Sequence, residues 1–146
     1  MPEGGCFCGR IRYETTAAPF HETNCHCSIC RRTSGAPFVT WLSVPRSEFR
    51  LVTGEPARFK ATAGATRSFC PHCGTPLTFE HDDFPGEIDF TTCSLDRPEL
   101  VPPKDHPWTS TKVSWLTLMM SFLNTQKIDG RSDGDARDTR RSNPTG

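Results

Sequence analysis

Residues 70–74 read Cys70-Pro71-His72-Cys73-Gly74. A gap of two residues between cysteines lets a tight turn aim both sulfurs at one point, and the following glycine permits the positive φ angle that such a turn needs. A tetrahedral zinc ion takes four thiolate or imidazole ligands, usually as two close pairs from separate parts of the chain. This stretch therefore predicts half of a zinc site whose other half lies elsewhere in the sequence.

The other half is predicted at Cys6-Phe7-Cys8, which is again followed by a glycine. A disulfide across so short a gap is strained, because bridged Cα atoms prefer to lie about 5.5–6 Å apart. The two pairs together make a closed set of ligands, which suits a structural zinc. Its predicted ligands are Cys6, Cys8, Cys70 and Cys73.

A third group, Cys25-His26-Cys27-Ser28-Ile29-Cys30, supplies three cysteines on one short segment. Three protein ligands with an open fourth position are the pattern of a catalytic zinc, so Cys25, Cys27 and Cys30 are the predicted ligands of a second ion. The alternative is that a fourth side chain closes this site and makes it structural. The candidates for this fourth ligand are Cys93, His26, His72 and His81, of which Cys93 would use every cysteine in the chain.

Other polar residues near these cysteines are weaker candidates for function. Arg31 and Arg32 directly follow the last predicted ligand and are candidates to contact a carboxylate of a thiol substrate. His26 is a candidate for acid–base work because it lies between two predicted ligands, whereas His72 is interpreted as a turn residue.

Composition limits the classes of protein that fit. The chain has 146 residues, of which 34% are hydrophobic, and carries 17 Lys and Arg against 17 Asp and Glu. This length predicts one domain. The modest apolar share predicts a small hydrophobic core that needs an additional stabilising cross-link. A net charge of zero argues against binding to nucleic acid, and the most apolar stretch, 115–123, is about half of a bilayer span. No secretion signal is recognised, so we expect a cytoplasmic protein whose thiols are free or metal-bound.

Short strands separated by turns dominate the pattern and predict a mainly β, mostly antiparallel fold with few short helices. One helix is expected near the cysteines, at Ser28–Ser34, where Gly35 and Pro37 end it. The predicted strands are 10–14, 37–42, 48–52, 57–60, 66–70, 77–79 and 88–91. Phenylalanines interpreted as core or half-buried strand residues are Phe38, Phe49, Phe59, Phe69, Phe79 and Phe90.

The last part of the chain differs in composition. Residues 124–146 include five basic and four acidic residues, three glycines and a proline, with two clearly apolar residues. Such a segment buries too little surface to offset the entropy of ordering it. We therefore predict a zinc-binding domain at 1–123 and a disordered tail at 124–146.

The motifs at residues 4–9, 25–38 and 69–77, with later segments at 94–98 and 106–115, strongly resemble the family of glutathione-dependent formaldehyde-activating enzymes, which includes centromere protein V. The resemblance covers residues 4–117 in matching order, and the three cysteine motifs together are specific. It implies a β-rich zinc fold like that of a small guanine-nucleotide-release chaperone. It also implies a structural zinc on the four-cysteine set and a catalytic zinc on the three-cysteine set, the same division as the ligand count.

The activity implied by the resemblance is the joining of glutathione to formaldehyde to make S-(hydroxymethyl)glutathione, a carbon–sulfur lyase reaction. The first hypothesis is therefore an enzyme with two zinc ions per chain, glutathione or another small thiol as co-substrate, and an aldehyde. The alternative is a non-catalytic binding module in which both zinc ions are structural and the surface contacts protein or nucleic acid. The balanced charge gives the nucleic-acid form of this alternative little support.

Overall fold

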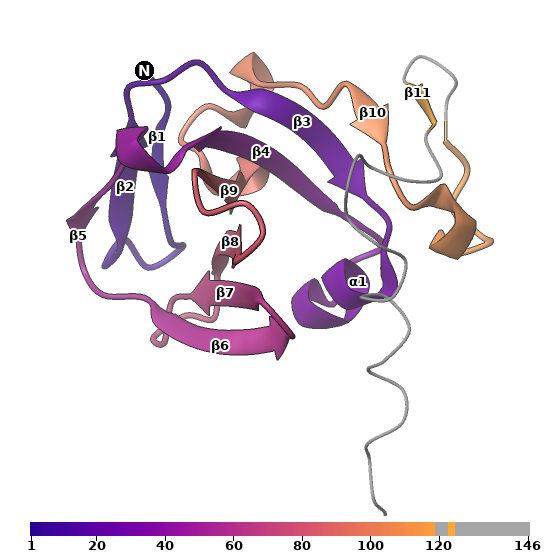
Figure 1. The fold of residues 1–146 in the computed structure, drawn as a ribbon, viewed down its shortest axis with the longest axis horizontal. Coiled ribbons are helices and arrows are strands. Elements are labelled where there is room, and N and C mark those ends of the chain that lie inside the picture. Colours follow the sequence, from indigo (N-terminus) through magenta and orange to yellow (C-terminus); the bar gives the residue numbers. More distant parts are fainter. Residues whose placement is uncertain (119–122, 125–146) are drawn as a thin grey trace, which may run out of the picture.

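The computed structural model describes residues 1–118 and 123–124, and in them the chain is mainly β, with strands, one α-helix and short 3₁₀ helices (Figure 1). The strands are β1 (Glu3–Gly5), β2 (Arg12–Thr15), β3 (Phe20–Cys25), β4 (Val39–Pro45), β5 (Phe49–Thr53), β6 (Ala57–Thr62), β7 (Ala65–Phe69), β8 (Pro76–His81), β9 (Glu87–Thr91), β10 (Asp105–His106) and β11 (Leu123–Asn124). The helices are α1 (Ser28–Ser34) and the 3₁₀ segments η1 (Arg46–Glu48), η2 (Thr92–Ser94), η3 (Pro98–Leu100) and η4 (Thr109–Thr111).

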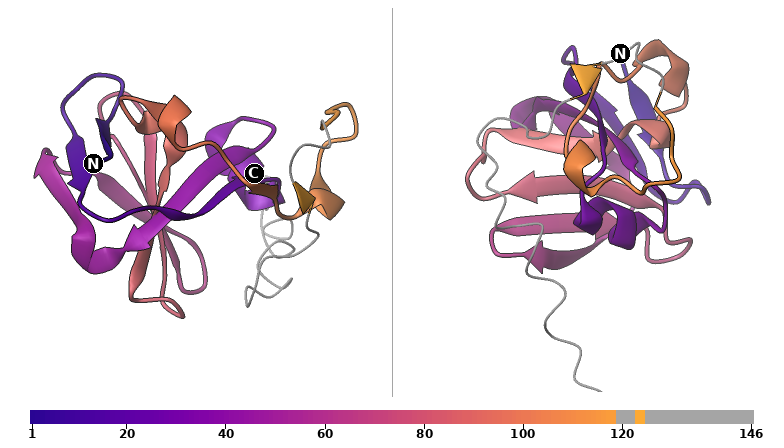
Figure 2. Two further views of the ribbon diagram at one scale, coloured as in Figure 1. Left: turned by 90° about the horizontal axis from the view of Figure 1, so that it is seen from above. Right: turned by 90° about the vertical axis from the view of Figure 1, so that its right-hand side faces the viewer.

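These strands form two sheets that face each other (Figures 1 and 2). The small sheet has the order β1-β2-β5, and the large sheet has the order β11-β10-β3-β4-β9-β8-β7-β6. All neighbours are antiparallel except β10, which runs parallel to both β3 and β11. The prediction of a mainly β, mostly antiparallel fold is confirmed.

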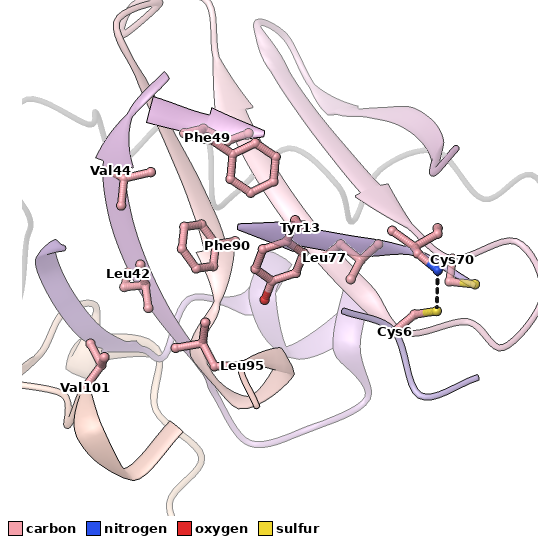
Figure 3. Close-up of a cluster of buried hydrophobic side chains, with 12 residues drawn as sticks. Cys6, Tyr13, Leu42, Val44, Phe49, Cys70, Leu77, Phe90, Leu95 and Val101 are labelled. Atoms are coloured by element: carbon pink, nitrogen blue, oxygen red, sulfur yellow. Dashed lines mark hydrogen bonds between the residues drawn. The ribbon is translucent and has the colours of Figure 1, made fainter. Parts of the chain in front are cut away.

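The main core lies between the two sheets (Figure 3). Tyr13 of β2 and Phe49 of β5 stack at 5.4 Å, and both contact the Phe90 ring of β9. The Tyr13 hydroxyl is paired with the Ser94 hydroxyl at 2.5 Å, so the buried polar end of this ring is satisfied. Side chains of Cys6 and Cys70 belong to the same cluster, which places sulfur atoms at one end of the core.

The opposite face of the large sheet is also covered. Successive strand residues point to opposite faces, so Leu42 faces the main core while Trp41, its neighbour on β4, belongs to a second cluster. That second cluster contains three cysteines together with Ile29, Val39 and Trp108. A sheet buried on both faces explains why its central strands carry buried residues in succession rather than a polar–apolar alternation.

The single α-helix of the described residues matches its predicted bounds, Ser28–Ser34. The Cys27 Sγ atom accepts the backbone N–H of Cys30 at 3.2 Å, so a cysteine takes the place of the usual N-cap oxygen. Gly35 ends the helix in the left-handed region, with φ 67°, and its N–H donates to the Arg31 carbonyl.

The structure also corrects parts of the sequence interpretation. All seven predicted strands overlap strands of the structure, but β1, β3, β10 and β11 were not predicted. Phe59 is 40% exposed, because β6 is an edge strand of the large sheet, so of the two positions expected for it, core or half-buried, the core position is wrong. The consecutive strands β5 and β6 do not pair with each other, because β5 pairs with β2 while β6 pairs with β7.

Two further expectations concern the ends of the domain. Among the described residues no helix is long and apolar enough to cross a membrane. Of the predicted tail, Asn124 belongs to β11, and residues 125–146 lie outside the described residues. The domain boundary at residue 123 stays a prediction.

Replacement of Gly4 tests the packing of β1 against the loop after β9. A Cβ atom at Gly4 would lie 2.4 Å from the Ser94 carbonyl oxygen and 2.7 Å from the Tyr13 hydroxyl. We expect Gly4→Ala to lower the free energy of unfolding by about 1–3 kcal/mol, because the backbone must shift. Gly86→Ala is the matched control, since a Cβ there meets nothing within 4 Å, and its effect should stay within about 0.5 kcal/mol. Chemical denaturation of the metal-loaded protein measures both, and equal effects would contradict the prediction.

Candidate metal centres and pocket

The four predicted ligands Cys6, Cys8, Cys70 and Cys73 form one cluster, here called the four-cysteine cluster, in which all sulfurs lie within 4.8 Å of one another. The Sγ atoms of Cys6 and Cys8 are 3.4 Å apart, and those of Cys8 and Cys70 are 3.8 Å apart. Zinc–sulfur bonds of about 2.3 Å place the sulfurs of a tetrahedral site about 3.8 Å apart. All four thiols are free, so their number, type and spacing fit a zinc ion.

Two turns of the same design present these sulfurs. In the first turn the Cys6 N–H donates to the Ile11 carbonyl and the Cys6 carbonyl accepts from Gly9. In the second turn the Cys70 N–H donates to the Thr75 carbonyl five residues ahead, and the Cys70 carbonyl likewise accepts from the glycine that follows the second cysteine. Both glycines have positive φ angles, 76° and 77°, which is the conformation that their positions in the sequence predicted.

Thr75 links the two turns. Its hydroxyl oxygen accepts the Phe7 N–H at 3.1 Å, and the hydroxyl lies 3.2 Å from the Cys73 sulfur. Hydrogen bonding from the Thr75 side chain and backbone lowers the pKa of Cys73 to about 5. On the exposed side Arg10 lies 2.9 Å from the His72 ring. The residues around this cluster therefore favour a thiolate and hold the two turns together.

The remaining predicted ligands, Cys25, Cys27 and Cys30, form the three-cysteine cluster, in which the sulfurs again lie within 4.8 Å of one another. Cys25 ends β3, Cys27 caps α1 and Cys30 lies in its first turn, so a strand end and a helix start aim three side chains at one point. All three are buried. Three thiolates at this spacing fit three positions of a tetrahedral zinc site.

A pocket opens beside the three-cysteine cluster. It encloses about 80 Å³, and all three cysteines line it. Trp41, Phe79 and Trp108 provide aromatic walls, while Arg67 and Asp89 provide charged groups. No residue of the four-cysteine cluster lines this pocket, so within the described part of the chain the two clusters have different surroundings.

Arg67 lies between two aromatic rings in this pocket. Its guanidinium carbon is 4.9 Å from the centre of the Phe79 ring and 5.3 Å from that of Trp41, distances typical of cation–π contacts. The side chain is 8% exposed, and its Nη2 atom donates to the Cys30 sulfur at 3.4 Å. The Trp41 indole N–H donates to the same sulfur at 3.4 Å.

These contacts favour a thiolate at Cys30. Hydrogen bonds from the Cys25 and Cys27 thiols hold the pKa of Cys30 well below its ordinary value. The nearby positive charge of Arg67 and the Trp41 N–H lower this pKa further, against the effect of burial. The pKa of Cys25 is instead raised, because its thiol is the partner that supplies the proton. Of these two cysteines, Cys30 is thus the one whose thiolate its surroundings favour.

Other candidates from the sequence lie outside this arrangement. Cys93 is exposed in η2 and belongs to neither cysteine cluster of the described residues. Arg31 is partly buried and Arg32 is exposed in α1, and neither lines the pocket. Their assignment as contacts for a thiol substrate stays a prediction.

The histidines near the cysteines serve other contacts. His26 is fully buried, its Nε2 lies 2.9 Å from Nδ1 of His106, and it does not line the pocket. Burial and the neighbouring His106 lower the pKa of His26 to about 4, so the ring is neutral at pH 7. His72 lies in the exposed turn beside Arg10, and His81 contacts Asp83 in the loop after β8.

Several pocket residues were not identified from the sequence as parts of a functional site. Ser43, Asp89, Phe79 and Arg67 occupy one row across β4, β9, β8 and β7, where each residue is the register partner of the next. These residues are far apart in the chain, and their shared row depends on strand pairing. A charged residue within the predicted strand 66–70 was the one available sign, but alternation alone did not say which face it occupied.

The chain was compared with known proteins. The model of the glutathione-dependent formaldehyde-activating enzyme family matches residues 1–111. A protein of Halomonas elongata, named as a candidate enzyme of this type, is 25% identical over 125 residues, which cover 80% of each chain. A crystal structure of a Rhodobacter sphaeroides protein superposes with a TM-score of 0.53 at 25% identity, over 64% of this chain and 87% of that one.

An uncharacterised lyase of Schizosaccharomyces pombe is 30% identical over 86 residues, which are 56% of this chain and 60% of the relative. The match thus spans less than two thirds of that relative's length, whereas the family model spans most of the present chain. The matched residues include both cysteine clusters and every residue that lines the pocket. The chain belongs to the glutathione-dependent formaldehyde-activating enzyme family.

Proposed function

We propose that this protein is a zinc-dependent carbon–sulfur lyase that makes and cleaves the adduct of a small thiol and an aldehyde. The observation that carries the proposal is the pocket beside the three-cysteine cluster, where Arg67 and Trp41 donate to one of the three sulfurs. A structural site needs no pocket and no buried cation. No residue of the four-cysteine cluster lines this pocket, and Arg10, which contacts His72 of the second turn, is exposed. The difference between the two clusters supports a difference in role.

The ligand sets support two zinc ions per chain. The four-cysteine cluster would hold a structural zinc, and the three-cysteine cluster would hold a second zinc. Such an ion supplies a Lewis-acidic position at which a thiol binds as its thiolate. Three thiolates and one Zn²⁺ sum to one negative charge, which the neighbouring Arg67 balances. Cys93 is exposed and belongs to neither cysteine cluster of the described residues, so we propose that the fourth position stays open to substrate.

The chain's own residues shape the reaction space. The rings of Trp41, Phe79 and Trp108 form an apolar wall that limits water around the reacting sulfur. The pocket holds both reactants beside the cluster, so the bimolecular addition gains from proximity and orientation. Trp41 is 7% exposed and its ring is fixed by a donor contact to Cys30, which keeps this wall in place.

Glutathione and formaldehyde are the substrates that we propose. The family's name and that of the Halomonas elongata relative both specify this pair. In the forward direction the thiol loses its proton, the sulfur forms a bond to the aldehyde carbon, and the carbonyl electron pair moves to oxygen. The oxygen then takes up a proton, which gives S-(hydroxymethyl)glutathione, and no electrons are gained or lost overall. Eight free cysteines suit the reducing cytoplasm, where we place this activity.

Zinc release tests the two-site assignment. We expect two zinc ions per chain, with one removed at least about ten times faster by a colorimetric chelator, because three protein ligands hold it instead of four. Cys27→Ser should abolish this fast phase and leave one zinc, while its hydroxyl keeps the N-cap of α1. Cys93→Ser is the control and should keep both ions. A zinc ion lost from Cys93→Ser would instead support the closed structural site.

Activity is tested by nuclear magnetic resonance exchange spectroscopy, since the adduct also forms without enzyme. We expect the wild-type protein to speed exchange between free glutathione and S-(hydroxymethyl)glutathione without moving their equilibrium. Cys27→Ser should lose at least about 99% of this acceleration, because it removes a ligand of the reacting centre. Its circular dichroism spectrum should match wild type. No acceleration by the two-zinc wild-type protein would refute glutathione and formaldehyde as substrates.

A further inference from the structure

Arg67 is an unusual residue for the interior of a β-sheet. It lies in β7 with 8% of its surface exposed, and in the described part of the chain it forms no ion pair with a carboxylate. Its Nε atom is buried and has no hydrogen-bond partner among the described residues. Burial of a cation is costly, and here the thiolates of the three-cysteine cluster, which Arg67 contacts at Cys30, supply the counter-charge in place of a carboxylate.

The nearby acid does not neutralise this charge. Asp89 lies on the same row of the large sheet, but Phe79 occupies the register position between it and Arg67. Strands about 4.8 Å apart put the Arg67 and Asp89 backbones about 10 Å from each other. Asp89 accepts the Ser43 hydroxyl at 2.6 Å on the far side of this row. The positive charge of Arg67 is therefore directed to the three-cysteine cluster and its pocket rather than to Asp89.

The position of the guanidinium is fixed before any substrate enters. The rings of Trp41 and Phe79 hold it at 5.3 and 4.9 Å, and one N–H is aimed at the Cys30 sulfur. A guanidinium has five N–H donors in a planar fork, so a contact to one sulfur leaves others for a neighbouring atom. Arg67 and the three cysteines line the same pocket. A substrate whose sulfur lies beside the cluster would therefore have its neighbouring carbon and oxygen in the space that this guanidinium borders.

We propose that Arg67 is a catalytic residue that binds the aldehyde oxygen and stabilises the negative charge that develops on it. This inference rests on the proposed function. When the thiolate sulfur attacks the carbonyl carbon, the π electron pair moves to oxygen, and Arg67 donates hydrogen bonds to the resulting alkoxide. The alkoxide then takes a proton from water, and hydroxide is neutralised by the proton that the thiol released. In the cleavage direction the same contacts stabilise the alkoxide that expels the thiolate.

A fixed donor of this kind acts on the transition state more than on the bound substrates. We expect Arg67→Met to lower kcat for adduct formation by about 100-fold or more, while KM for glutathione changes less than about threefold. Arg67→Lys keeps the charge without the planar fork and should recover only part of this loss. Arg50→Met is the matched control, because Arg50 is exposed in β5 and pairs with Glu14 away from the pocket.

A binding measurement gives a second readout that does not depend on turnover. Mercaptoacetate carries an anionic oxygen near its sulfur, and 2-mercaptoethanol carries a neutral one in a chain of the same length. We expect titration calorimetry on the zinc-loaded protein to show that Arg67→Met weakens mercaptoacetate binding by about tenfold or more, because a charge-assisted hydrogen bond is lost. Binding of 2-mercaptoethanol should change much less, and Arg50→Met should alter neither.

The outcomes separate this inference from the proposed function. An inactive wild-type protein whose Arg67→Met variant still loses mercaptoacetate binding would refute the substrates but support an anion-binding Arg67. An active wild type with unchanged kcat and unchanged thiol selectivity in Arg67→Met would overturn the inference alone. Loss of one zinc per chain in both Arg67 variants would also overturn it, because Arg67 would then serve the metal site rather than the substrate.

Discussion

The rest of the structure depends on the close approach of two cysteine turns from different sheets. One turn joins β1 to β2 in the small sheet, and the other joins β7 to β8 in the large sheet. The sulfurs of Cys8 and Cys70 approach to 3.8 Å across the two turns, and Cys6 and Cys70 are part of the main core. A chain with 34% hydrophobic residues has little apolar surface to hold two sheets together. A metal ion bound by both turns would link the two sheets through metal–sulfur bonds rather than through a large buried apolar surface.

The packing of the two sheets against each other also determines which residues lie on the far face of the large sheet. Residues of one strand alternate between faces, so Leu42 and Phe90 fill the core while Trp41 and Asp89 face the pocket. A shift of one residue in the pairing would exchange the two sets and put charged groups into the core. The packing against the small sheet therefore selects the register, and the register places Arg67 beside the three-cysteine cluster.

The sequence was sufficient to predict the features that are set by residues close together along the chain. The bounds of α1 follow from its local cap at Cys27 and from Gly35, and both cysteine groupings follow from spacing. The strand β3 was missed because Glu22, Thr23 and Asn24 are all buried, which removes the alternation that marks a strand. The pocket was missed for a different reason, since its charged row needs four strands in register.

The two faces of the large sheet show how one element supports both stability and chemistry. The core face is apolar, and its buried Tyr13 hydroxyl has a partner in Ser94. The pocket face carries Arg67 and Asp89, which a sheet built for stability alone would replace with apolar residues of similar size. These buried charged residues lie on one face only, beside a cluster of thiols. Such a departure from stable packing is typical of a functional site. Under the proposed mechanism the charge of Arg67 thus serves twice: it faces the thiolates of the three-cysteine cluster at rest, and it stabilises the negative charge that develops on the substrate oxygen during the reaction.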